Sequence, residues 1–97
     1  MATYILLGSY TEKGIAEMKD SPKRLDGARK LAKSLGAKLT EFYLTMGGPD
    51  FVVMLEAPDD ETVAKLVLNV AAKGAVRTTT LKAFSEKDYR KLCASLN

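Results

Sequence analysis

Two short segments of the chain carry almost unbroken runs of apolar, strand-forming residues. Residues 3–8 read TYILLG and residues 50–57 read DFVVMLEA. Runs of this kind are typical of strands that are covered on both faces of a sheet. Residues 38–45 (KLTEFYLT) and 76–84 (VRTTTLKAF) instead mix polar with apolar positions, as strands at exposed sheet edges do. The pattern therefore predicts two central strands and two edge strands.

Helical periodicity follows the first predicted strand. Thr11 is expected to cap a short helical turn. In the longer helix that comes next, Ser21 is the expected N-cap, Pro22 occupies the first helical position, and Gly36 ends the helix. The apolar positions of this helix recur at helical spacing, which predicts one face packed against the sheet. They are Leu25, Ala28, Leu31, Ala32 and Leu35.

A second long helix and a C-terminal helix are predicted by the same signals. Asp59 is the expected N-cap of the second helix, and Gly74 its stop. Ser85, with Asp88 three residues later, resembles a capping box that opens the C-terminal helix. The apolar stripes are Val63, Leu66, Val67, Val70 and Ala71 in the second helix, and Tyr89, Leu92, Cys93 and Leu96 in the C-terminal helix.

The predicted order is β-α-β-β-α-β plus a C-terminal helix, within a single domain spanning residues 1–97. This order predicts an α+β, ferredoxin-like fold with an antiparallel sheet. Right-handed crossovers place both long helices on one face of that sheet. The first and third strands are expected side by side in the middle, and the second and fourth at the edges. The other face of the sheet is then left open.

The open face is expected to carry an apolar patch whichever way the strands are turned. Alternation separates Phe51, Val53 and Leu55 from Val52 and Met54. Four or five apolar side chains, each contributing roughly 1.5 to 3 kcal/mol on burial, are enough to associate two chains. We therefore expect a homodimer or higher homo-oligomer through this face, with the C-terminal helix over part of the rim. The alternative is a monomer in which that helix folds over its own open face.

The amino-acid composition excludes several classes of catalytic and metal site. The 97 residues are 46% hydrophobic and 28% charged, as in an ordinary folded domain. The chain has no histidine and one cysteine, which excludes a Ser-His or Cys-His nucleophile pair and the histidine-containing zinc sites. We expect no metal and no cofactor.

The N-terminal apolar run is too short for a membrane span and lacks the basic lead-in of a signal peptide, so a cytoplasmic location is expected.

Charge gives little support for nucleic-acid binding. Fifteen Lys and Arg are offset by twelve Asp and Glu, for a net charge of +3. The basic segment at residues 23–38 is interrupted by Asp26 and is typical of a solvated helix face. RNA-recognition domains of this strand order stack bases on aromatic residues of the central strands. Here the third strand offers Phe51 followed by Val53 and Leu55, so that platform is missing.

The Gly47-Gly48-Pro49-Asp50 segment between the second and third strands is interpreted as a bend. Glycine tolerates positive φ, proline presets φ near −65°, and Asp50 can accept backbone N–H groups where the next strand begins. A phosphate cradle is disfavoured, because a strand and not a helix N-terminus follows the glycines.

The chain resembles the GYD domain family, small bacterial proteins of the dimeric α/β-barrel kind, over nearly its whole length. The residues that carry the resemblance are TYILLGSYTEKGI, DSPKRLDGARKLAKSLGAKLTEFYLTMG, DFVVMLEAPDDET and VRTTTLKAF. The family is named for a Gly-x-Tyr-Asp-like turn before the third strand. Here Gly48, Pro49 and Asp50 stand at that turn, so the tyrosine is absent and its role cannot be carried over. The resemblance implies the fold and dimerisation and assigns no activity.

Four residues are candidates for holding a small anionic or phenolic ligand between sheet and helices: Tyr10, Tyr43, Asp50 and Arg77. The alternative is that these side chains only pack against their neighbours and form surface hydrogen bonds. The first functional hypothesis is a small binding or accessory protein. The alternative is a cofactor-independent oxygenase or isomerase of the dimeric α/β-barrel type, which would need a perturbed carboxylate, lysine or tyrosine as its acid or base.

Overall fold

A computed structural model describes residues 1–97 and contains one antiparallel sheet of four strands in the order β2-β3-β1-β4. The strands are β1 (Ala2–Tyr10), β2 (Lys38–Leu44), β3 (Phe51–Ala57) and β4 (Val76–Ala83). The apolar strands β1 and β3 are central and the mixed strands β2 and β4 are at the edges, as the sequence predicts. The ferredoxin-like α+β fold is therefore confirmed.

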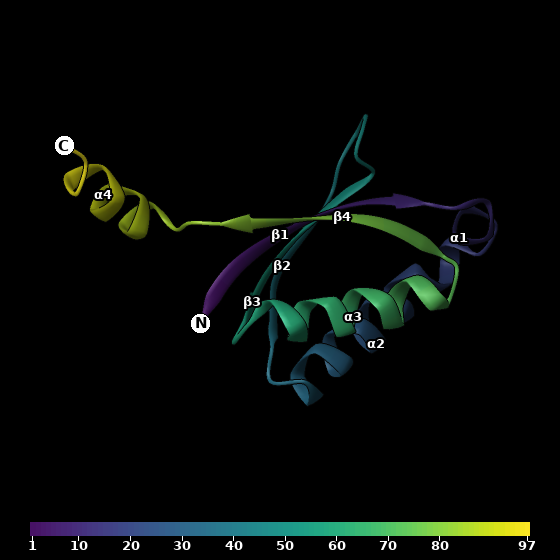
Figure 1. The fold of residues 1–97 in the computed structure, drawn as a ribbon. Helices are drawn as coiled ribbons and strands as arrows, with labels where there is room; N and C mark the ends of the chain where they lie inside the picture. Colours follow the sequence, from purple (N-terminus) through teal and green to yellow (C-terminus); the bar gives the residue numbers. More distant parts are fainter.

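The two long helices cover one face of the sheet (Figure 1). The helices are α1 (Glu12–Ala16), α2 (Ser21–Ser34), α3 (Asp60–Ala72) and α4 (Glu86–Ala94), with a 3-10 turn at Met18–Asp20 before α2. Figure 1 shows α2 and α3 side by side beneath the sheet, with no helix above it. The face opposite α2 and α3 is called the open face below.

Three of the predicted helix caps are present. The side chains of Thr11, Asp59 and Ser85 accept hydrogen bonds from the backbone N–H groups three residues later, at 3.2, 2.9 and 3.2 Å. The start of α2 differs from the prediction: Ser21 is already helical and Asp20 precedes it without a side-chain cap bond. The reason is that the 3-10 turn runs directly into α2, so no extended residue is left to act as a cap.

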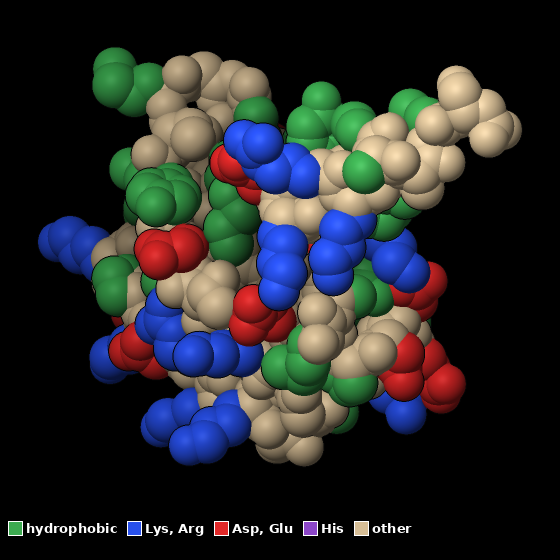
Figure 2. Space-filling model, turned by 90° about the vertical axis from the view of Figure 1, so that its left-hand side faces the viewer, with side chains coloured by type: hydrophobic (Ala, Val, Ile, Leu, Met, Phe, Trp, Pro, Cys, Tyr) green, Lys and Arg blue, Asp and Glu red, His purple; other side chains and the backbone are tan.

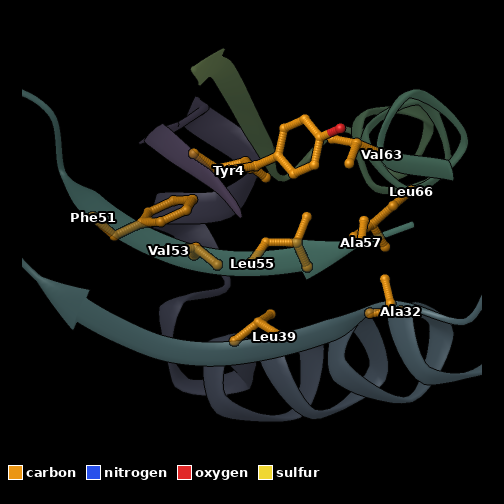
Figure 3. Packing of buried hydrophobic residues seen from close by; sticks show 11 residues of the cluster. Tyr4, Ala32, Leu39, Phe51, Val53, Leu55, Ala57, Val63 and Leu66 are labelled. Carbon is orange, nitrogen blue, oxygen red and sulfur yellow. The ribbon is translucent and has the colours of Figure 1, made fainter. Parts of the chain in front are cut away.

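The strand register decides which apolar set meets the helices. Val53 pairs with Leu6, and Leu55 with Tyr4, so these side chains share the helix-covered face. All four are buried, and Leu55 has no exposed surface. Figure 3 shows the side chains of β3 on this side, facing Ala32 of α2 and Leu66 of α3.

The open face carries the other set. Val52 pairs with Leu7 and Met54 with Ile5, and all four are only half-buried. Leu81 of β4 lies beside Ile5 and extends the patch toward the sheet edge. The predicted apolar patch is thus present on the open face.

A bulge in β2 changes which of its residues face the helices. The register shifts between Leu39 and Glu41, so Leu39 and Phe42 both lie on the helix-covered side although they are three residues apart. Tyr43 pairs with Val52 and consequently lies on the open face.

The C-terminal helix stands away from the rest of the chain. α4 projects beyond the end of β4 (Figure 1), and every one of its residues is exposed. It does not cover its own sheet, so the alternative in which α4 folds over its own open face is not the observed arrangement. None of the helices is long and apolar enough to cross a membrane.

Candidate functional site

A cavity of about 100 Å³ lies between the helix-covered face of the sheet and helices α2 and α3. It is found where β1 ends and β3 and β4 begin, close to the start of α2 and the end of α3. Fourteen of its eighteen lining residues are hydrophobic. A small, mostly apolar recess with a few polar groups at its rim is the usual form of a ligand site.

Aromatic rings form one wall of this cavity. Phe51 packs between Tyr10 and Phe42, with ring centroids 5.2 and 5.5 Å away. The ring of Phe51 lies against the backbone of Gly8, where any β-carbon would overlap it. The absence of a side chain at Gly8 therefore sets the depth to which Phe51 sinks into the core.

The polar part of the lining is cationic. Arg24 and Lys73 line the cavity together with the hydroxyl-bearing residues Ser21 and Thr78. The guanidinium of Arg24 donates to the carbonyl oxygens of Glu17 (3.0 Å) and Gly14 (3.3 Å), which holds it in place. The lining contains no Asp or Glu. The charged residues of the lining therefore favour an anionic ligand group over a cationic one.

The structure distributes the four predicted ligand residues over both sides of the sheet. Tyr10 lines the cavity, and the carboxylate of Asp50 accepts a hydrogen bond from the Tyr10 backbone N–H at 2.9 Å. Tyr43 and Arg77 lie on the open face, since they pair with Val52 and Ser9. Of the four, only Tyr10 is among the residues that line this cavity.

The residues that sequence reasoning missed are Phe42, Arg24 and Lys73. Phe42 was concealed by the bulge, because simple alternation gives its place to Tyr43. Arg24 lies one turn into α2, and Lys73 lies at the end of α3. A charged residue close to the apolar side of each helix was the sequence feature that could have indicated both.

The Gly47 to Asp50 segment is a bend and lines no part of the cavity. Gly47 has φ of +108°, which glycine adopts without strain. The backbone N–H of Thr45 donates to the Asp50 carbonyl at 2.8 Å, and the Asp50 N–H donates to the Gly8 carbonyl at 2.8 Å. The geometry of the bend thus explains the residue types found in this segment.

A cluster of interacting polar side chains lies outside the cavity. The hydroxyl of Tyr4 donates to the Asp60 carboxylate, which also lies 3.2 Å from the Lys82 ammonium. The hydrogen bond to Asp60, with burial, raises the pKa of Tyr4 to about 12. The Tyr4 hydroxyl and then Lys82 lower the pKa of Asp60. Figure 3 shows the Tyr4 ring between β1 and α3 with its oxygen directed toward α3.

These pKa shifts do not place an acid or base in the cavity. The displaced pKa values belong to Tyr4, Asp59 and Asp60, and none of the three lines it. The Tyr4–Asp60–Lys82 cluster instead ties β1, α3 and β4 together.

Charges of both signs mix on the face of the molecule shown in Figure 2. On the end of the molecule that carries both termini, Lys and Arg side chains are interspersed with Asp and Glu (Figure 2). This face of the molecule therefore lacks the single-sign field that steers nucleic acid to a protein.

The chain is similar to the glutamine synthetase and cystathionine beta-lyase binding protein of Thermus thermophilus. The two are 34% identical over 89 residues, which cover 91% of this chain and 94% of the relative. This relative is named for binding two enzymes.

Solved structures agree with the fold. The crystal structure of TTHA0845 from Thermus thermophilus is 23% identical, with a TM-score of 0.56 over 88% of this chain and 95% of that one. The feast or famine regulatory protein of M. tuberculosis, complexed with L-methionine, is 13% identical with a TM-score of 0.65, over 90% of this chain and 55% of that one. The sequence model of the GYD domain matches residues 4–93. The chain therefore belongs to the GYD domain family.

Proposed function

We propose that the protein is a small accessory protein that binds a partner enzyme through α4 and works as a homodimer formed through its open sheet face. The observation that carries the proposal is the uncovered apolar side of α4. Tyr89, Leu92 and Leu96 are 59%, 47% and 75% exposed. They fall on one side of the helix at i, i+3 and i+7, as in helices that dock into apolar grooves.

The length of α4 adds to this argument. A helix of nine residues is marginal in water when nothing packs against it. The Ser85 cap and the Glu86–Arg90 ion pair at 2.9 Å supply only local stabilisation. Docking on another protein would bury the apolar side and supply the packing that its own chain does not.

The partner class comes from the similar Thermus protein. Its name gives glutamine synthetase and cystathionine beta-lyase as the enzymes that it binds. The match covers nearly the whole of both chains, so no additional domain of the relative has to be invoked for that binding. We take these two enzymes, from the same organism as this chain, as the partners to test.

Self-association is assigned to the open face. Its central side chains are the half-buried Ile5, Leu7, Val52 and Met54, with the exposed Leu81 beside them. No helix of the chain lies over them (Figure 1). A contiguous apolar surface on a sheet is a typical site of isologous dimerisation, in which the same patch meets itself.

The experiment is biolayer interferometry with each enzyme immobilised and the accessory protein in solution. Leu92→Glu is compared with Ala94→Glu, which adds the same charge to the opposite side of α4. We expect Leu92→Glu to weaken binding at least tenfold and Ala94→Glu to change it little. Light scattering on both variants should show an unchanged dimer.

Two results would contradict the proposal. Equal effects of the two variants would show that the apolar side of α4 is not the contact. Dissociation of the dimer by Leu92→Glu would assign α4 to the interface between copies instead of to the enzyme.

A further inference from the structure

The cavity beneath the sheet lies on the opposite side from the open face and takes no part in the proposed associations. We propose that it binds a small monocarboxylate with a phenyl or branched aliphatic body, the body in the apolar recess and the carboxylate at Arg24 and Lys73. This inference does not depend on the proposed function, since neither α4 nor the open face contributes to the cavity lining.

The size and lining of the recess fit the apolar body. About 100 Å³ is several times the roughly 10 to 15 Å³ of such space that admits a single water molecule, so the recess has room for a group of several heavy atoms. A phenyl or isobutyl group is of this size. The surrounding walls are the rings of Phe42 and Phe51 and the aliphatic side chains of Leu25, Val67 and Val70. Leu25, Val67 and Val70 remain half-buried, so an occupant would complete their burial.

The mouth of the recess fits the carboxylate. Two of the five N–H groups of Arg24 are used on the carbonyls of Glu17 and Gly14, which fixes the guanidinium and leaves other donors available. The Lys73 ammonium has no acidic partner within the chain. Charge-assisted hydrogen bonds from a preset guanidinium and an ammonium are the contacts by which proteins hold carboxylates.

The same lining argues against a free amino acid as the occupant. An α-ammonium group needs a carboxylate or several acceptor groups close to the carboxylate site. None of the eighteen lining residues is Asp or Glu. Asp50, the nearest acidic residue in sequence to the aromatic wall, already accepts the Tyr10 backbone N–H. A compound with one negative charge and no positive charge is therefore preferred.

The test is a titration of the full chain with three matched probes, followed by ¹H–¹⁵N NMR. The probes are 3-phenylpropionate, its neutral amide 3-phenylpropionamide, and L-phenylalanine. We expect 3-phenylpropionate to shift the amide signals of Val70, Val76 and Thr78 and to bind at least tenfold more tightly than either of the others. Equal affinity for the acid and the amide, or no shift with any probe, would overturn the proposal.

Two variants locate the binding. Lys73→Gln should weaken 3-phenylpropionate about tenfold, whereas Lys33→Gln, on an exposed part of α2 outside the lining, should not. Ala28→Leu places extra carbon atoms in the recess and should abolish binding without lowering the urea midpoint. Binding that survives Ala28→Leu, in a chain that remains folded, would place the ligand elsewhere. Capture of the partner enzymes should be unaffected by these variants, which keeps the two proposals separable.

Discussion

Adjacent valines of β3 offer a matched pair of perturbations, because Val52 and Val53 point to opposite faces of the same strand. Val53 is 5% exposed in the core between sheet and helices, whereas Val52 lies at the centre of the open face. Replacing each separately by Asp introduces the same charge at neighbouring positions. The fold predicts loss of folding in one case and loss of association in the other.

The expected loss of folding stability in Val53→Asp follows from the burial of Val53. The substitution removes roughly 1.5 to 3 kcal/mol of apolar burial. It also places a carboxylate among apolar side chains without a partner, which costs several kcal/mol more. Domains of this size have a total stability of about 5 to 15 kcal/mol. We therefore expect Val53→Asp to be largely unfolded or strongly destabilised in urea titrations followed by circular dichroism.

The expected loss of association free energy in Val52→Asp follows from the two-fold symmetry of the dimer. In a two-fold dimer each substitution occurs twice, so the loss is roughly 3 to 6 kcal/mol of association free energy. At about 1.4 kcal/mol per factor of ten, the dissociation constant should rise by about 10² to 10⁴. The monomer should keep its native circular dichroism spectrum. Light scattering across a concentration series measures this shift, with Val52→Thr as the uncharged control. Equal behaviour of the two Asp variants would refute the assignment of faces.

Four further predictions concern stability. Gly8→Ala should lower the free energy of unfolding by about 1 to 3 kcal/mol in urea, because its methyl group overlaps the Phe51 ring. Asp59→Ala should lower it by about 0.5 to 2 kcal/mol, because the α3 N-cap bond to the Thr62 N–H is lost; a neutral result would show that the cap is redundant. The Tyr4 pKa is raised to about 12, so its bond to Asp60 contributes fully below pH 10 and is lost as the pH rises toward 12. The difference in urea midpoint between wild type and Tyr4→Phe should therefore shrink above pH 10, and a difference that stays constant from pH 8 to 12 would argue against the raised pKa.

Low pH should weaken the Tyr4–Asp60 contact as well, because it protonates the Asp60 carboxylate. The pKa of Asp60 is lowered by the Tyr4 hydroxyl and Lys82, so its contribution is present above the usual carboxylate pKa and is lost as the pH falls through the lowered value. The midpoint difference between wild type and Tyr4→Phe should also narrow below about pH 4. A difference unchanged down to pH 2 would argue against a lowered pKa of Asp60.

The local parts of the fold were predictable because each depends on neighbouring residues. Helix caps at Asp59 and Ser85 need only the residue and the next turn of chain. The central position of β1 and β3 follows from their continuous apolar runs. What the sequence left open was which face of β3 meets the helices, because Val52 and Val53 are equally apolar. The strand register decided this through pairing with Leu6 and Leu7.

The cavity lining, the Tyr4–Asp60 contact and the position of α4 were harder to predict, each for its own physical reason. The bulge after Leu39 changes the alternation, so Phe42 and not Tyr43 enters the cavity. The Tyr4–Asp60 hydrogen bond joins residues 56 positions apart, and no local pattern indicates it. The amphipathic pattern of α4 is the same whether the helix covers its own sheet or another protein.

The measurement that tests the central claim most directly is native mass spectrometry of the chain, alone and mixed with glutamine synthetase or cystathionine beta-lyase from the same organism. One spectrum reports the assembly state and the partner together. We expect a free species at twice the 10.5 kDa chain mass and enzyme complexes that gain mass in pairs of chains. A free species at the mass of one chain, with both enzymes unchanged in mass, would contradict both the dimer and the accessory role.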